Sequence, residues 1–137
     1  MQKTSNYQLN QWAKSDRILM DDFNADNQKI DAALAGMPKL ALGTYTGTGG
    51  KGQSAPTSLT LSFPPKFLAV FPINGLYRLL CARGMEGSNT SPNGHSYGNV
   101  AVAWDGSTVS WHTTDSGAGA DFQLNRLDTQ YFYIALG

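Results

Sequence analysis

Charged residues and long apolar runs are both scarce in this sequence, and each scarcity excludes a class of protein. Only 15% of the residues are charged, and ten lysines and arginines balance ten aspartates and glutamates. Such a chain lacks the basic surface of a typical nucleic-acid-binding protein and any electrostatic anchor for an acidic membrane, so we expect neither partner. No apolar stretch approaches the roughly 18 residues of a membrane span, and none near the N-terminus resembles a secretory signal.

Residues that bind metals or carry out catalysis are equally few. Cys81 is the single cysteine, which excludes an intrachain disulfide, and its apolar neighbours predict a small buried side chain. His95 and His112 are the only histidines, lie in no metal-binding spacing, and are expected to be solvated. Glu86 is the only glutamate, and no carboxylate pair suited to glycoside hydrolysis is evident. The glycine-rich residues 47–52 lack the spacing of a phosphate-binding loop. The sequence therefore predicts no catalytic residue, metal site or cofactor.

Uncharged polar residues, glycine and aromatic residues are abundant instead. The chain has 15 glycines and 11% aromatic residues, a composition typical of short strands joined by turns. Half of the charged residues nevertheless lie in residues 1–39, whereas all glycines but Gly36 lie beyond them. With Pro38 at the junction, this shift predicts two parts, a helical segment over residues 1–39 and a β-sandwich domain over residues 40–137.

The first segment is predicted to form an N-terminal helix over residues 16–35. Ser15 suits the N-cap, Asp16 the first turn, and Gly36 the position after the last turn. Its apolar residues form a thin, imperfect heptad stripe and are the candidate oligomer interface: Leu9, Trp12, Leu19, Phe23, Ile30 and Leu34. A narrow stripe favours association with identical helices, whereas packing against the chain's own sheet, the alternative, calls for a broader apolar face. Because so short a bundle would be weak, the following domain is expected to contribute to the oligomer.

The second segment shows the pattern of an antiparallel β-sandwich of seven or eight short strands. Alternating or apolar runs predict strands at residues 42–46, 58–63, 67–71, 76–82, 120–124 and 131–136. Phe132, Ile134 and Leu136 are expected to share one face of the last strand. The fold class is therefore mainly β, with a self-associating helix ahead of the sandwich.

Turn residues fix two hairpins in this segment. Asn74-Gly75 separates two apolar runs, which predicts a tight turn. A two-residue loop at Asp105-Gly106 would pair Val102 with Val109. That register places four side chains in the core: Val100, Val102, Val109 and Trp111.

Two segments, residues 47–57 and 84–98, are longer than ordinary hairpin loops. The second is rich in asparagine, serine and glycine, which together with tyrosine are common in adaptable recognition loops. Aromatic rings can stack on sugars, and polar side chains can hydrogen-bond to their hydroxyls. Asn93, His95 and Tyr97 are therefore the candidate receptor-binding residues, with Tyr77 a weaker one. The alternative is that they are ordinary solvated turn residues.

The N-terminal segment contains the motifs NYQLNQW (residues 6–12), DR (16–17), DFNADN (22–27) and KIDAAL (29–34). The β segment contains GTYTG (43–47), LTLSFPPK (59–66) and the closing YFYIALG (131–137). These motifs resemble those of short tail-fibre or receptor-binding proteins from bacteriophages and prophages of Gram-positive bacteria. Together these motifs cover about half of the chain, at both ends and at the start of the β domain.

The resemblance implies a homotrimeric appendage of a virion or phage-tail-like particle, made in the bacterial cytoplasm without a signal peptide. Its N-terminal segment would bind other virion or baseplate proteins, and its β domain would bind a bacterial surface glycan or another receptor. Two alternatives stay open: a free-standing, lectin-like carbohydrate-binding module, and a small hydrolase that degrades envelope polysaccharide. The native mass of the protein distinguishes the trimeric appendage from the carbohydrate-binding module, because the module is expected to be a monomer.

Overall fold

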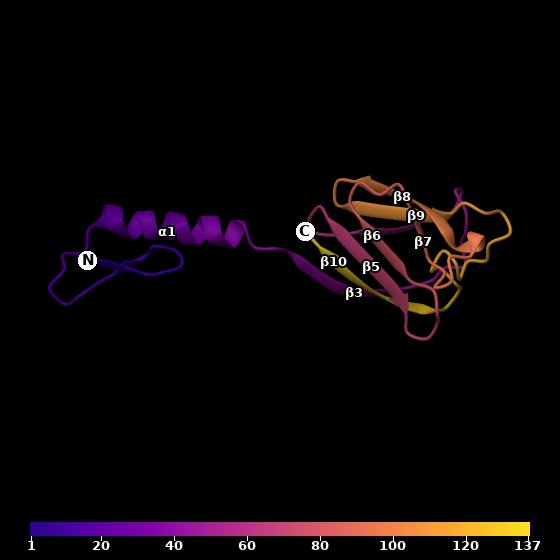
Figure 1. Cartoon of the computed structure of the whole chain (residues 1–137), viewed down its shortest axis with the longest axis horizontal. Coiled ribbons are helices and arrows are strands. Elements are labelled where there is room, and N and C mark those ends of the chain that lie inside the picture. The colour runs from indigo at the N-terminus through magenta and orange to yellow at the C-terminus, as the bar shows by residue number, and fades with distance from the viewer. The chain divides into compact units, whose positions relative to one another are not determined.

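Gly36 and Pro38 interrupt the chain between a helix and the first long strand, and the protein divides there into two units. The structure, a computed structural model, describes residues 1–137 as the units Met1–Pro38 and Lys39–Gly137 (Figure 1). The predicted boundary at residue 39 lies beside this division.

The first unit contains a short hairpin and then the helix. Strands β1 (Gln2–Lys3) and β2 (Asn10–Gln11) pair antiparallel and precede α1 (Met20–Ala35). The predicted helix start at Asp16 is therefore wrong, because the helix begins four residues later and a short hairpin precedes it, whereas the predicted end at Ala35 is confirmed. Asp16 accepts a hydrogen bond from the Ala13 backbone N–H at 2.9 Å, so its carboxylate stabilises an earlier turn. Leu19, not Ser15, is the N-cap, and its side chain makes no capping hydrogen bond.

This boundary shortens the predicted heptad stripe. Leu9 and Trp12 flank β2 and lie outside the helix, which corrects their assignment to the helical stripe. Asp26, which interrupts the stripe, accepts the Asn10 backbone N–H at 2.8 Å and lies 3.2 Å from Lys29 Nζ. Lys29 Nζ also donates to the Gln8 carbonyl at 2.7 Å. The polar positions of the helix thus hold the hairpin segment in place.

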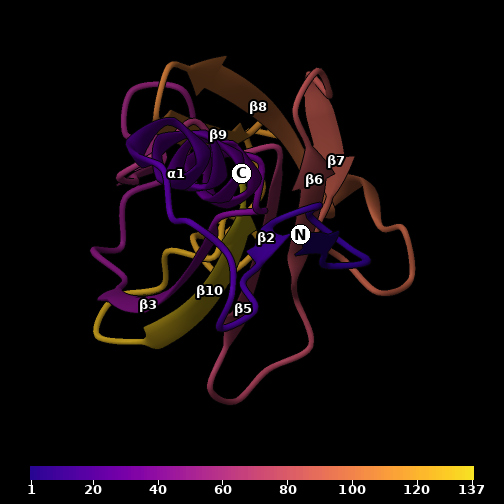
Figure 2. The ribbon, with the colours of Figure 1, turned by 90° about the vertical axis from the view of Figure 1, so that its left-hand side faces the viewer.

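The second unit is an antiparallel β-sandwich of eight strands, which confirms the predicted fold class. One sheet has the strand order β3 (Leu40–Thr46), β10 (Gln130–Leu136), β5 (Phe67–Pro72), β6 (Leu79–Ala82). The other has the order β4 (Thr57–Thr60), β9 (Thr108–Thr113), β8 (Asn99–Asp105), β7 (Gly87–Asn89). In the end-on view, β8 and β9 lie on one side and β3, β10 and β5 on the other (Figure 2).

The core lies between the two sheets and is fully enclosed. Its largest members are Trp111, Tyr131, Leu68, Leu79 and Leu124, none more than 2% exposed. Cys81 is also buried, as predicted. Its Sγ lies 3.8 Å from the Leu68 carbonyl.

The β8–β9 hairpin has the predicted core but a different register. Val102 pairs with Trp111, and Asp105 with Thr108, so the two-residue loop is Gly106-Ser107 and not Asp105-Gly106. Gly106 has a φ of 54°, and glycine at the first loop position is the preference of a type II′ turn. A slip of two residues returns every side chain to its original face, so the four predicted core residues are buried as expected: Val100, Val102, Val109 and Trp111.

Three predicted strand boundaries are wrong. β4 ends at Thr60, although Leu61 and Phe63 beyond it are buried. β6 begins at Leu79, so residues 73–78 form a longer connection than the tight Asn74-Gly75 turn. Residues 120–124 form consecutive turns, because their polar atoms bind neighbouring loops and not a sheet ladder.

Four connections gather at one end of the sandwich: residues 47–56, 73–78, 90–98 and 114–129, the third including the short 3-10 helix η1 (Ser96–Gly98). At the opposite end the chain enters and leaves the sandwich, where the backbone N–H groups of Lys39 and Gly137 each donate to the other's carbonyl, at 3.1 and 2.9 Å. The long loops and the C-terminus lie at opposite ends of this unit in Figure 1. The sandwich therefore has a tethered end and a loop end.

Candidate functional site

The loop end is organised around one completely buried polar side chain, Gln123, from the connection between β9 and β10. Its Oε1 accepts the backbone N–H groups of Gly52 at 2.8 Å and Thr113 at 3.0 Å. Its Nε2 donates to the Ala55 carbonyl at 2.8 Å, and its own carbonyl accepts the Trp111 indole N–H at 2.7 Å. One amide therefore joins two long loops to the core strand β9.

Asn125 fastens the same two loops a second time. Its Oδ1 accepts the Thr48 backbone N–H, and its Nδ2 donates to the Gly50 carbonyl, both at 2.9 Å. Gly47 makes this approach possible, because a Cβ there would meet the Arg126 carbonyl oxygen at 2.1 Å. The glycine-rich residues 47–52 are thus held by the side-chain amides of Asn125 and Gln123.

Three aromatic rings and a histidine line a hollow of about 320 Å³ at this end. The Tyr77 and Phe122 ring centroids lie 4.4 Å apart, those of Tyr97 and Phe122 lie 5.9 Å apart, and His95 lies 4.8 Å from Tyr97. The other residues around this aromatic hollow are Leu76, Ser91, Pro92 and Asn93. All three predicted receptor-binding residues, and the weaker candidate Tyr77, therefore line a single concavity.

Backbone contacts fix the loop that presents these residues. His95 caps the 3-10 helix, with its Nδ1 accepting the Tyr97 backbone N–H at 3.3 Å. Asn89 Nδ2 donates to the His95 carbonyl at 3.0 Å. The tyrosine ring remains 40% exposed, so it offers an open face for stacking. The hollow is thus a shaped surface of apolar rings with amide, hydroxyl and imidazole groups around it.

Phe122 is the residue of this hollow that the sequence did not nominate. It falls in residues 120–124, which were predicted to be a strand, and no local pattern places it beside Tyr77 and Tyr97. The Thr90 hydroxyl donates to the Phe122 carbonyl at 2.7 Å and so draws the two loops together. Only the tertiary contacts of the buried Gln123 and Thr90 bring this ring into place.

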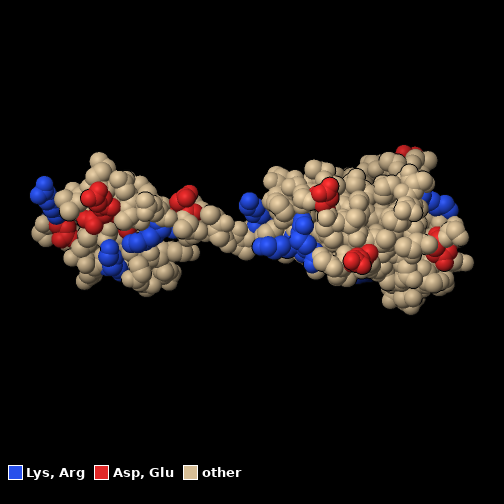
Figure 3. Space-filling view, turned by 90° about the horizontal axis from the view of Figure 1, so that it is seen from above, with Lys and Arg blue, Asp and Glu red and all other residues tan.

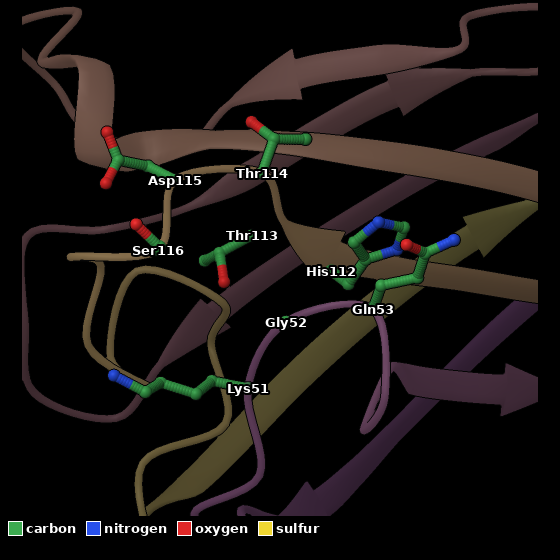
Figure 4. A pocket seen from close by; sticks show the side chains of 8 residues that line it. All are labelled: Lys51, Gly52, Gln53, His112, Thr113, Thr114, Asp115 and Ser116. Carbon is green, nitrogen blue, oxygen red and sulfur yellow. The ribbon is translucent and has the colours of Figure 1, made fainter.

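A second, polar hollow of about 430 Å³ lies beside the loop that follows β9 (Figure 4). Its lining carries one ammonium, one carboxylate, one imidazole and several hydroxyls: Lys51, Gly52, Gln53, His112, Thr113, Thr114, Asp115 and Ser116. In Figure 4, His112 and Gln53 stand together on one side, and Asp115 and Ser116 lie on another. Lys51 Nζ donates to the Ala118 carbonyl at 2.9 Å. Asp115 is the one carboxylate of this polar hollow.

Gly117 separates the two hollows. A Cβ at this position would lie 3.2 Å from Asp115 Oδ1 and 3.3 Å from the Tyr97 ring. The aromatic and polar hollows are therefore neighbours, and both are framed by the connection between β9 and β10. On the face of the sandwich in the space-filling view, charged side chains are few and of both signs (Figure 3). The loop end thus combines exposed aromatic rings with hydroxyl, amide and imidazole groups and a few charges of both signs.

Burial raises the pKa of three ionisable groups in the core of the sandwich. It raises the pKa of the Tyr45 hydroxyl, with a further contribution from the neighbouring Tyr131. Burial also raises the pKa of Tyr131, and it raises that of the Cys81 thiol to about 12. Tyr45 donates to the Leu124 carbonyl at 2.6 Å, so its neutral form supports the same connection. The Tyr131 hydroxyl accepts the Arg126 backbone N–H at 3.1 Å, so the two tyrosines are structural supports of the loop end.

The structure holds no group of three or more histidine, cysteine, aspartate or glutamate side chains placed to bind a metal. Its single helix is too short and too polar to cross a membrane. Comparisons with protein-family models, with curated proteins and with solved structures found no match to this chain.

Proposed function

We propose that this chain is a non-enzymatic, homotrimeric adhesive appendage of a phage or phage-tail-like particle. In this proposal α1 forms the trimer stem, and the loop end of the sandwich binds a glycan on a bacterial surface. The hairpin segment before α1 attaches the appendage to other particle proteins.

The exposed apolar stripe of α1 is the observation that carries this proposal. No residue of the helix is buried, and its stripe residues are between 43% and 61% exposed: Leu19, Phe23, Ile30 and Leu34. A helix with large apolar side chains in water gains stability by covering them, and a narrow stripe fits identical helices around an axis. Within its own unit nothing covers this stripe, and identical helices around an axis would cover it.

The two ends of the sandwich support an adhesive role. The chain enters at Lys39, beside the C-terminus, and the long loops lie at the far end. A receptor-binding head tethered at one end would present its recognition surface in this way. The rings of Tyr77, Tyr97 and Phe122 offer apolar faces for sugar rings, and the polar hollow beside them offers partners for hydroxyls.

The native mass of the full chain, measured by light scattering after size exclusion, tests the proposal. We expect a trimer, and we expect Phe23→Asp with Ile30→Asp to dissociate it, because two carboxylates per chain would be buried in the stem. The matched control is Asn24→Asp with Gln28→Asp, which adds the same charges at exposed helix positions outside the stripe. A monomeric wild type, or a double variant of unchanged mass, would contradict the trimer.

A free-standing carbohydrate-binding module is the second candidate, and the aromatic hollow is the observation that favours it. It predicts a monomer that still binds glycans and loses binding on Tyr97→Ala. The mass measurement therefore separates the two candidates before any ligand is known.

A further inference from the structure

The outer face of the first sheet is apolar across all four strands. The strand registers align Leu42, Ile134, Ala69 and Leu80 in one row across the sheet. The neighbouring row consists of Leu40, Leu136, Phe67 and Ala82, and the row on the other side contains Thr44, Phe132 and Phe71. No charged residue belongs to these rows. We call this surface the apolar sheet face.

Several of these side chains stand in water in the isolated chain. Leu42 is 68% exposed, Leu40 58%, Leu80 52% and Leu136 40%. They point away from the core, because Tyr131, Leu68, Val70 and Leu79 occupy the alternate positions of the same strands and are buried. Both the inner and the outer face of this sheet are thus apolar, which is the pattern of a sheet that is covered on both faces.

The second sheet provides an internal comparison. Its central outer row is Ser58, Ser110 and Ala103, and the residues beside that row on the same face include Thr60, Thr108, Asp105 and His112. This outer face has the polar composition expected of a solvated antiparallel sheet. The two faces belong to the same sandwich, so the contrast is specific to the first sheet.

We propose that other copies of this chain cover the apolar sheet face, so that the sandwich adds a second subunit interface to that of α1. This inference deepens the proposed function, since it rests on the homotrimer for the number of copies. Two copies of a surface without charge are electrostatically compatible, because they can meet without placing like charges opposite each other.

The area of the surface also favours a second copy as the occupant. β10 has 7 residues, so four strands cover roughly 23 Å by roughly 19 Å, or about 440 Å². The apolar side of α1, with 16 residues, adds a strip of roughly 24 Å by about 10 Å. Neither surface alone reaches the approximately 800 Å² per partner of a standard interface, and together they approach it.

Chain connectivity joins the two surfaces. α1 ends at Ala35 and β3, an edge strand of the apolar sheet face, begins at Leu40. A second copy brings the same two surfaces in the same order along its chain, so a single symmetric association can cover both. A different partner protein would have to match the sheet and the helix separately.

The experiment compares two lysine pairs in the full chain by sedimentation over a range of concentrations. Leu42→Lys with Leu80→Lys places charges at both ends of the central apolar row, at positions already more than half exposed. Ser58→Lys with Ala103→Lys is the matched control on the polar sheet, also at exposed positions. We expect the first pair to raise the concentration of half-dissociation at least about 100-fold and the control to leave it within about threefold. Thermal unfolding should show that both variants are folded.

The outcomes separate this inference from the proposed function. If the Leu42 and Leu80 pair keeps the wild-type mass while Phe23→Asp with Ile30→Asp dissociates the trimer, the stem stands and the sheet interface is wrong. If the sheet pair dissociates and the helix pair does not, the sheet interface stands and the stem is wrong. A wild type that is monomeric at every concentration overturns both.

Discussion

At the scale of single residues, Gln123 carries more of the loop end than any other side chain. It is completely buried and binds Gly52 and Ala55 in the connection between β3 and β4 and Thr113 at the end of β9. We expect Gln123→Ala to lower the free energy of unfolding by about 2–4 kcal/mol, because it leaves two N–H groups and a carbonyl without partners in a dry site. Urea unfolding followed by tryptophan fluorescence measures this loss.

Gln53 supplies the control for that measurement. It lies in the neighbouring loop, its side chain is exposed, and Gln53→Ala should change the free energy of unfolding by less than about 0.5 kcal/mol. Equal effects of the two substitutions would mean that the buried amide does not support the loops as described.

The buried hydroxyl and thiol groups predict a loss of stability at alkaline pH. Burial raises the pKa of Tyr45, Tyr131 and Cys81 in the folded chain, so the unfolded chain releases these protons first. Stability is therefore fully present below about pH 9 and falls above it, by up to about 1.4 kcal/mol per pH unit for each group that ionises only on unfolding. Urea midpoints between about pH 8 and about pH 11 measure the decline.

Two tyrosine variants test the cause of that decline. Tyr45→Phe should reduce the decline of the free energy of unfolding with pH by the contribution of one group. Tyr7→Phe, at an exposed tyrosine, should leave the slope of this decline unchanged. A free energy of unfolding that stays constant across this pH range would show that the three groups are accessible to water in the folded protein.

At the scale of secondary-structure elements, the local sequence predicted the features that depend on the alternation of inward and outward side chains. It did not predict the features that depend on hydrogen bonds to residues distant in the sequence. The core of the β8–β9 hairpin was predicted although its register was not, because a two-residue slip preserves the faces. The helix start was misplaced because Ser15 and Asp16 favour a cap and a turn equally well, and the Ala13 N–H binds Asp16 in a turn. The pattern of residues 120–124 predicted a strand, but their polar atoms bind other loops and these residues form turns.

The candidate site divides in the same way. Asn93, His95 and Tyr97 were predicted from loop composition, since they are close in sequence and one loop presents them. Phe122 and the polar hollow could not be predicted, because long-range hydrogen bonds from Gln123, Asn125 and Thr90 assemble them. The last strand shows a further limit. Phe132, Ile134 and Leu136 do share a face, but Tyr131 and Ala135 take the core side and leave that face outside.

At the scale of the whole molecule, each unit leaves apolar surface in water that its own fold does not cover. The stripe of α1 lies in one unit and the apolar sheet face in the other, while the polar outer sheet shows that the sequence can build a solvated surface. The loop end carries both polar and aromatic side chains, unlike the apolar sheet face. These three surfaces are consistent with one kind of contact between copies and a different kind between the assembly and a glycan.

Adhesion should therefore depend on the number of copies. Immobilised cell walls from Gram-positive bacteria, titrated with the full chain, should bind the trimer at least about 100-fold more tightly than the Phe23→Asp and Ile30→Asp variant, because linked sites rebind at high effective concentration. The monomeric variant should keep the weak binding of a single loop end, since its substitutions lie in α1 and leave the aromatic hollow intact. Tyr97→Ala should instead remove binding without changing the mass, because the proposed binding mode stacks a sugar on this exposed ring. If the dissociated variant bound cell walls as tightly as the trimer, a single sandwich would hold the whole affinity, and the advantage of three copies would have to lie in anchoring the particle.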